Sequence, residues 1–159
     1  MGNPTKTNAM RLLERAKIAY TPVYYDLGDT EFSGEAVAAL TGIPPAQSFK
    51  TLCAKGDRRG VLVFVVPVNA ELNLKLAALA AGEKRIELLP TKDLLAHTGY
   101  VRGCVSPLGM KKAYPTFIDE TARAFDTIAV SAGAKGASLL VAPDALSGCI
   151  RTEFAALRG

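Results

Sequence analysis

Residues 49–68, FKTLCAKGDRRGVLVFVVPV, decide the fold of this chain. Two runs in this stretch, 49–54 and 61–68, are rich in apolar and β-branched residues, which is typical of strands. The polar segment 56–60 between them has a glycine at each end and predicts a turn. We therefore expect two strands joined by a tight connection.

The rest of the chain interleaves helices and strands. The expected helices are an opening one with Ala9, Leu12, Leu13 and Ala16, capped by Thr5 or Thr7 and stopped by Pro22, then 34–40 between Ser33 and Gly42, 70–81 between Asn69 and Gly82, 92–97 after Thr91, and a broken one over 144–157. The other expected strands are 23–25, 85–89, 100–105, 116–118, 127–131 and 138–141. Because no regular β-α-β period appears, the sequence favours an α+β fold, a mixed sheet flanked by helices, over a Rossmann fold. Without a linker or a repeat, residues 1–159 are expected to form a single domain.

Composition excludes several classes of site. The 159 residues carry a formal net charge of +4, which suits a polyanionic partner without requiring one. The single histidine, His97, rules out an imidazole pair for zinc, and no dinucleotide-binding or P-loop motif occurs, so we expect no metal and no other cofactor. Three widely spaced cysteines, Cys53, Cys104 and Cys149, argue against a disulfide framework. With no pattern of a secretory signal peptide, we expect a reducing, cytoplasmic compartment.

Lys50 is the first candidate for chemistry, because it interrupts an otherwise apolar strand. The residue either points outward into solvent, by strand alternation, or lies in a pocket where it meets an anion. Spacing alone favours the outward position. In a cleft, the compact ammonium group would suit a phosphate or a carbonyl oxygen that gains negative charge.

Two glycine-bearing segments form the second group of candidates. Within 98–112, the residues of 106–109 fit a type I turn, and Gly99 and Gly103 would let the backbone approach a ligand closely. Free N–H groups in such loops bind anions. Equally, the glycines of 98–112 and of the segment 131–136 can serve ordinary turns, and composition does not decide between these interpretations.

Six stretches of the chain form a pattern. In chain order they are 6–13 (KTNAMRLL), 49–52 (FKTL), 99–103 (GYVRG), 106–112 (SPLGMKK), 115–120 (PTFIDE) and 131–133 (SAG). Together they resemble the YbaK/EbsC family, free-standing relatives of the editing domain inserted in bacterial prolyl-tRNA synthetases. The similarity runs nearly from end to end. It implies an α+β domain with a strongly curved mixed sheet, and a cytoplasmic aminoacyl-tRNA deacylase.

The resemblance implies a catalytic role for Lys50, which stands in the family's F/Y-K-T-L context. The substrate-binding residues that it implies are Tyr25, Phe32, Thr51, Gly103, Cys104, Ser106, Gly109, Ser131, Gly133 and Ser138. A gap in the match between Tyr25 and Phe32 leaves Tyr24 as an alternative to Tyr25. Two residues depart from the family pattern: Cys104 replaces a second glycine, and Ser138 stands where an acidic residue is frequent. Either change could alter which aminoacyl group is accepted.

The activity implied by the resemblance is the release of cysteine mischarged onto tRNA(Pro). The aminoacylated 3′ end would be the ligand, prolyl-tRNA synthetase a partner, and no membrane would be involved. In the cysteine-specific relatives, the substrate's own thiol is thought to attack its carbonyl, which requires no enzyme nucleophile and no metal. Lys50 would hold the terminal adenosine or the ester, and backbone N–H groups near Gly103 would stabilise the oxyanion. Two alternatives stay open: an Ala-tRNA(Pro) deacylase that uses water, and a non-catalytic module that binds tRNA or a nucleotide.

Overall fold

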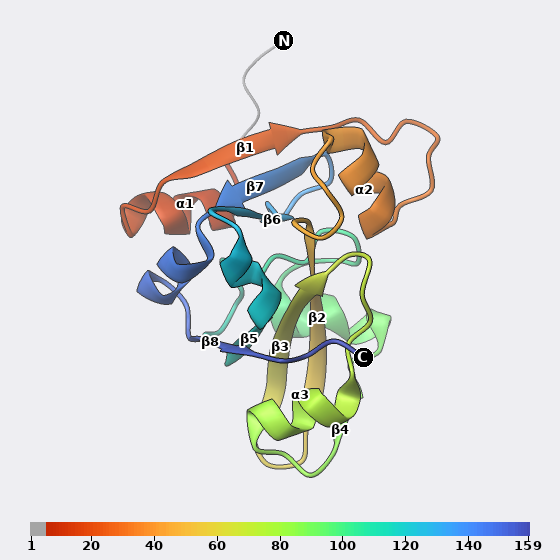
Figure 1. Ribbon diagram of the computed structural model, residues 1–159, viewed down its shortest axis with the longest axis vertical. Coiled ribbons are helices and arrows are strands. Elements are labelled where there is room, and N and C mark those ends of the chain that lie inside the picture. Colours follow the sequence, from red (N-terminus) through yellow and green to blue (C-terminus); the bar gives the residue numbers. More distant parts are fainter. Residues whose placement is uncertain (1–5) are drawn as a thin grey trace.

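The molecule contains two β-sheets that meet at the start of strand β2 (Figure 1). A computed structural model describes residues 6–159 of the chain. Ser48, directly before β2 (Phe49–Gly56), forms an isolated parallel bridge with Ala129 of β6 (Ile128–Ser131). The start of β2 is therefore close to both sheets.

The larger sheet has five strands in the order β4-β2-β3-β5-β8. Besides β2, they are β3 (Gly60–Pro67), β4 (Ile86–Leu88), β5 (Thr116–Asp119) and β8 (Thr152–Ala155). β2 and β3 form an antiparallel hairpin in which Lys50 pairs with Val66, whereas β3 pairs with β5, and β5 with β8, in parallel. Helix α3 (Leu74–Ala81) packs its buried alanines into an apolar cluster with Phe64 and Phe117 of this sheet.

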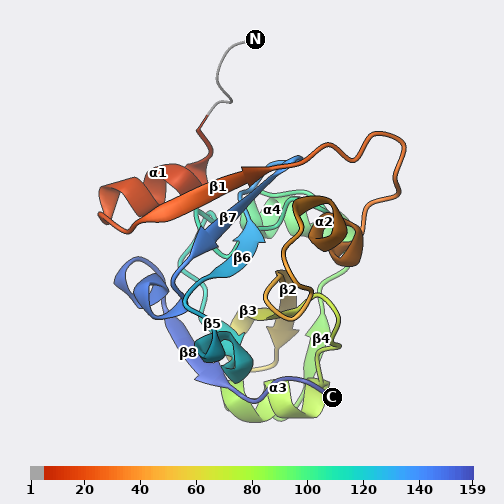
Figure 2. The ribbon, with the colours of Figure 1, turned by 45° about the horizontal axis from the view of Figure 1, so that its top comes forward.

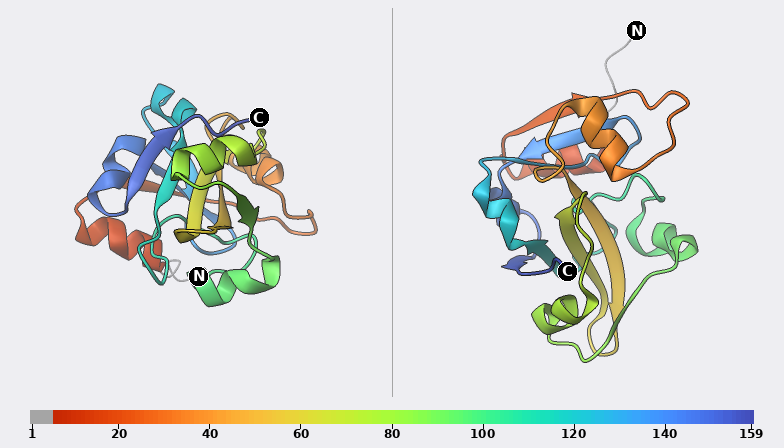
Figure 3. Two further views of the ribbon diagram at one scale, coloured as in Figure 1. Left: turned by 90° about the horizontal axis from the view of Figure 1, so that it is seen from below. Right: turned by 45° about the vertical axis from the view of Figure 1, so that its right-hand side comes forward.

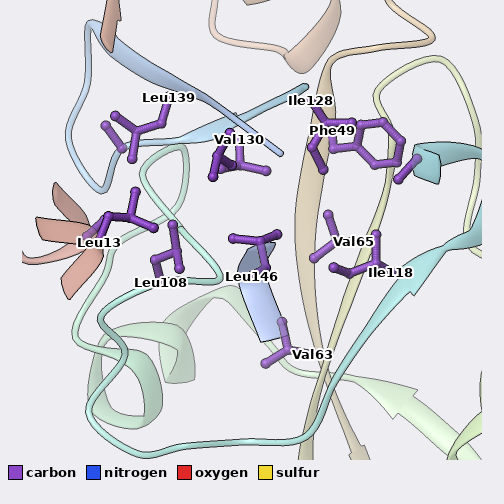
Figure 4. Packing of buried hydrophobic residues seen from close by; sticks show 14 of the residues in the cluster. Leu13, Phe49, Val63, Val65, Leu108, Ile118, Ile128, Val130, Leu139 and Leu146 are labelled. Atoms are coloured by element: carbon purple, nitrogen blue, oxygen red, sulfur yellow. The ribbon is translucent and has the colours of Figure 1, made fainter. Parts of the chain in front are cut away.

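The smaller sheet is antiparallel, with the order β1-β7-β6, where β1 is Tyr20–Tyr24 and β7 is Ala137–Val141. Helix α1 (Asn8–Arg15) buries Leu13 in the same apolar cluster as residues of both sheets (Figure 4). Members of this cluster include Phe49, Val63, Val65 and Ile118 from the larger sheet and Ile128, Val130 and Leu139 from the smaller one. One core thus holds the two sheets together.

Two further helices lie near the β2–β3 hairpin, one above its end and the other to its right in the right-hand view of Figure 3. They are α2 (Gly34–Thr41) and α4 (Leu94–Thr98), and Figure 2 shows both beside the smaller sheet. Three 3-10 turns complete the elements: Thr91–Asp93, Glu120–Ala124 and Pro143–Gly148. The loop between α4 and β5 carries the glycine-bearing segment that follows residue 98.

The elements with strong local signals are confirmed. The predicted hairpin forms β2 and β3, and the expected mixed α+β architecture with flanking helices is present. Ser33 caps α2 by accepting a hydrogen bond from a first-turn N–H at 3.0 Å, and Gly42 ends the helix with a φ of 75°. Thr7 caps α1, while Thr5, the alternative cap, lies outside the described residues.

Two helix boundaries were predicted wrongly. α1 ends at Arg15, because Lys17 has a φ of 59°, and Pro22 lies inside β1, an edge strand that tolerates a missing N–H. α3 begins at Leu74 rather than Ala70, because Asn73, and not Asn69, accepts hydrogen bonds from the first-turn N–H groups.

Three other predictions failed because long-range pairing decides these segments. Residues 100–105 form a loop instead of a strand. The end of the expected helix 144–157 is strand β8, which gains backbone hydrogen bonds from β5. The strands also divide into two sheets where the sequence suggested one.

Candidate active site

A pocket of about 460 Å³ opens where the two sheets meet. Its walls come from α2, the first half of β2, the paired ends of β6 and β7, α4 and the loop residues that follow α4. Of the residues predicted for the site, the pocket brings together Tyr25, Phe32, Lys50, Thr51, Gly103, Ser131 and Ser138. The volume lies in the range of about 300–1,000 Å³ that is usual for pockets that bind small ligands.

Lys50 lines this pocket and is half-buried. Its place is fixed by the register of β2 with β3 and by the neighbouring Phe49, which is buried in the core. No salt bridge within residues 6–159 includes Lys50, and no Asp or Glu of that part of the chain lines the pocket. Arg102 adds a second cation to the lining. The electrostatics therefore favour a ligand that is anionic or that develops negative charge.

The structure decides between Tyr24 and Tyr25, the two alternatives that the sequence left open for the first aromatic residue of the pocket. Tyr25 lines the pocket, whereas Tyr24 is 49% exposed and does not line it. Burial raises the pKa of Tyr25, so its phenol stays protonated at neutral pH. The ring of Phe32 lies against Gly103, where an added Cβ would come within 3.5 Å of the ring. Phe32 and Gly103 thus form one edge of the pocket.

Hydroxyl groups supply the polar part of the lining. Thr51 Oγ1 is buried and has no hydrogen-bond partner within the described residues 6–159. Ser131 and Ser138 face each other in the β6–β7 register, and Ser131 Oγ accepts a hydrogen bond from the Gly133 N–H at 3.1 Å. A buried hydroxyl without a partner is costly, so Thr51 Oγ1 is the one buried polar side-chain atom of the described residues that is left unsatisfied next to the pocket.

Several backbone N–H groups of the Gly103 loop have no acceptor within the described residues, among them those of Arg102, Gly103 and Val105, which line the pocket. Within residues 6–159 the Gly103 N–H has no hydrogen-bond acceptor, whereas the Cys104 N–H donates to the Val101 carbonyl at 2.9 Å. Gly103 has a φ of 89°, a conformation that favours glycine. The Cys104 N–H is therefore engaged within the loop, whereas the Gly103 N–H is not.

Four predicted substrate-binding residues lie outside the pocket lining. Cys104 is buried, and its thiol is close enough to Tyr25 to contribute to raising the pKa of that phenol. Ser106 is fully buried, and its Oγ accepts a hydrogen bond from the Leu108 N–H at 3.2 Å. Gly109 and Gly133 both pack closely against Tyr100. These residues shape the loops around the pocket from behind.

Sequence reasoning missed part of the lining. Arg102 lies within the stretch 99–103, but nothing in the sequence pattern indicates a role for its charge. The apolar wall includes Val37 and Val68 near α2, and Leu88, Leu89 and Leu94 near α4. Their positions depend on how β4 and α4 pack against β2, and a single sequence carries no signal for that packing.

His97 does not line the pocket. It lies in the last turn of α4, where its carbonyl accepts a hydrogen bond from Tyr114 Oη at 2.6 Å. In the part of the chain that the structure describes, no three His, Cys, Asp or Glu side chains gather as a metal site would need. None of the helices there has the length and apolar character to span a bilayer.

Cys53 lines the pocket as a thiol of low reactivity. Burial raises its pKa to about 11, so only about 0.1% is thiolate at pH 8. We expect iodoacetamide at about pH 8 to modify Cys53 in the folded protein at least about tenfold more slowly than in urea-denatured protein. Mass spectrometry of the peptide with Cys53 measures the rate of modification in the folded and in the denatured protein, and the peptide with Cys149 is followed for comparison. Equal rates in both states would contradict the burial of this thiol.

Residues 31–149 match the family described as the aminoacyl-tRNA editing domain. The chain belongs to this family. The editing domain is 43% identical over 150 residues to EbsC of Enterococcus faecalis, whose name proposes deacylation of Cys-tRNA(Pro) and Cys-tRNA(Cys), and the match covers 94% of this chain and 92% of that protein. A proline–tRNA ligase of Bacillus licheniformis is 31% identical over 98 residues, which are 62% of this chain and 17% of the ligase. The resemblance seen in the six sequence stretches is confirmed.

Solved structures share the fold of the editing domain. One, described as a candidate trans-editing enzyme for prolyl tRNA synthetase, has a TM-score of 0.83 at 19% identity and covers 100% of this chain and 99% of that one. Another, described as a hypothetical protein, has a TM-score of 0.85 at 19% identity, with coverages of 96% and 100%. These likenesses establish that the α+β arrangement is that of an editing-type domain.

Proposed function

We propose that this editing domain acts in trans as an aminoacyl-tRNA deacylase that releases cysteine from mischarged Cys-tRNA(Pro). One observation carries the proposal. The pocket holds Lys50, Arg102 and unpaired polar groups at Thr51 and Gly103, and no carboxylate of residues 6–159 lines it. This combination suits an ester whose carbonyl oxygen gains charge next to a phosphate-bearing nucleotide.

The chemistry follows from what the substrate brings. An aminoacyl ester is already activated, so the pocket needs to orient it and stabilise the developing oxyanion. The cysteine thiol forms a bond to its own carbonyl carbon, and the ester bond to the ribose oxygen breaks. The thiol proton ends on that oxygen, so the products are uncharged tRNA and a cyclic thioester. Lys50 holds the adenosine or ester in place, and the Gly103 N–H donates to the oxyanion.

Comparison of three aminoacyl groups on the same tRNA tests this mechanism. Serine is nearly isosteric with cysteine, but its hydroxyl is far less ionised than a thiol, which is a few per cent thiolate at pH 7. We expect cysteine to be released at least about tenfold faster than serine or alanine. Release of labelled amino acid from the three charged forms of tRNA(Pro) measures the difference.

The same assay separates the alternatives. Equal rates of release of alanine and cysteine would indicate that water attacks the ester, because alanine has no thiol. Salt-sensitive binding of tRNA without any release would reduce the domain to a binding module.

We propose further that prolyl-tRNA synthetase cooperates with the domain in the cytoplasm. A domain of 16.8 kDa with a net charge of +4 offers limited surface for gripping a whole tRNA. Deacylation measured with and without the synthetase tests this part. A rate that the synthetase leaves unchanged at limiting tRNA would contradict it.

A further inference from the structure

A second concavity, of about 380 Å³, lies between α1 and the loop residues 107–114. Its lining includes Arg11 and Arg15 from α1 and Lys111 and Lys112 from the loop. No Asp or Glu of residues 6–159 lines it. We call it the basic groove. It shares no lining residue with the candidate active site.

None of the four cations of the basic groove forms a salt bridge within the described residues, and the acidic group close to Arg11 is Glu14, whose pKa is lowered mainly by its hydrogen bond from Lys6 and in smaller part by Arg11. Salt bridges there involve Lys6, Arg123 and Arg158, and none of the groove cations. Glu14, the carboxylate of α1, accepts hydrogen bonds from Lys6 Nζ at 2.6 Å and Tyr20 Oη at 2.7 Å. Lys111 Nζ reaches only a backbone carbonyl, at 3.4 Å.

Such a grouping of exposed like charges repels itself weakly, and a bound anion would relieve the repulsion. Arg11 and Arg15 are four residues apart on one helix face, a spacing at which like charges repel. Both guanidinium groups can bind phosphate oxygens through paired hydrogen bonds, and the two lysines add point charges. Several cations spread along one hollow suit a polymer of phosphates better than a single small anion.

The groove and the active site are connected by one loop. Val105 lines the active-site pocket and Pro107 lines the basic groove. Residues two apart in the chain are separated by at most about 7 Å. Ser106 between them is buried, so an RNA whose end enters the pocket would reach the groove by passing around this loop.

We propose that the basic groove binds the sugar-phosphate backbone of the acceptor stem of the tRNA whose aminoacylated end enters the pocket. This inference rests on the proposed function for the identity of the RNA. It assigns duplex binding to Arg11, Arg15 and Lys112, and it leaves the chemistry to the pocket. The groove would thus contribute to KM for whole tRNA and not to the rate of the bound ester.

The test compares two double variants. Arg11→Gln/Arg15→Gln removes two charges from the groove while keeping good helix formers. Lys84→Gln/Arg85→Gln removes two charges from exposed residues between α3 and β4, at the opposite end of the molecule from α1 (Figure 1). Each protein is assayed with charged tRNA(Pro) and with a charged CCA trinucleotide that lacks the stem.

We expect the groove variant to raise KM for charged tRNA about tenfold at about 50 mM salt, with kcat and the trinucleotide reaction unchanged. The difference from wild type should nearly vanish at about 200 mM salt, because two fewer counterions are released. The control variant should behave as wild type. A single Lys112→Gln variant, which leaves α1 intact, should give a smaller shift of the same kind.

Other outcomes overturn the inference. Equal effects of the two double variants would indicate general charge attraction, and equal losses on tRNA and trinucleotide would place the groove in the catalytic machinery. Fluorescence anisotropy measures the affinity for uncharged tRNA, and so tests the contribution of the groove to binding independently of catalysis. The wild-type protein could release no amino acid, while Arg11→Gln/Arg15→Gln binds tRNA more weakly than wild type. In that case the proposed function is wrong and the proposal for the groove is supported. Unchanged tRNA affinity in a folded groove variant refutes the groove.

Discussion

Lys50→Ala is expected to lower kcat/KM for Cys-tRNA(Pro) deacylation by about a hundredfold to a thousandfold, while the protein still folds. Lys50 holds the adenosine or ester in place, and a substrate displaced by about 1 Å typically reacts about a hundredfold more slowly. The pocket contains no carboxylate of residues 6–159, so no internal partner is left with an unpaired charge when the ammonium group is removed. We therefore expect the free energy of unfolding to change by no more than about 1 kcal/mol.

Lys55→Ala provides the matched control for Lys50→Ala. Lys55 lies on the same strand, is exposed, pairs with Val61 and does not line the pocket. Its loss should change kcat/KM by less than about twofold, as for other surface positions. Lys50→Arg keeps the charge but changes its shape, and we expect intermediate activity. Near-normal activity of folded Lys50→Ala would remove the central residue of the mechanism.

The sequence was informative wherever one short segment carries its own signal. Ser33 and Gly42 bound α2 because a hydroxyl cap and a left-handed glycine act within a single turn. The hairpin of β2 and β3 follows from two apolar runs and a polar turn. In contrast, β8 looks helical in isolation and becomes a strand because β5 offers it a parallel edge.

The site shows the same division. The pattern singled out Lys50, but its spacing favoured an outward position, whereas the structure places the residue in the pocket lining. The periodicity of one strand does not tell which surface meets a cleft. The end of β1 distinguishes Tyr24 from Tyr25: Tyr24 is the last residue of the strand, whereas Tyr25 follows it and lines the pocket. Arg102 went unassigned because its position depends on the loop path between α4 and β5, which no local rule determines.

Gly109 and Gly133 lie in two different loops, and both are close to the side chain of Tyr100. Both are predicted to lie next to the substrate, but in the structure neither lines the pocket. Tyr100 is buried, and its hydroxyl donates a hydrogen bond to the Leu108 carbonyl at 2.5 Å. The ring therefore fastens the two glycine-bearing loops together behind the pocket. A side chain at either glycine would compete with this ring for space.

Gly133→Ala is accordingly expected to destabilise the fold by about 3 kcal/mol. Gly133 has a φ of 90°, and an alanine there incurs about 1–2 kcal/mol of backbone strain. Its Cβ would also lie 2.7 Å from Tyr100 Cε1, and relieving such overpacking typically costs about 1–3 kcal/mol. The midpoint of thermal unfolding should fall by about 6–12 °C, measured by circular dichroism.

Gly28→Ala separates the two contributions. Gly28 has a φ of 54°, and an added Cβ there would meet nothing within 4 Å. This control should therefore show the backbone strain alone, with a fall in melting temperature roughly half as large. If Gly133→Ala is no worse than Gly28→Ala, Tyr100 does not hold the loop. If it is worse, the excess should shrink when Tyr100 is replaced by leucine, because the two side chains compete for one volume and their effects are then not additive.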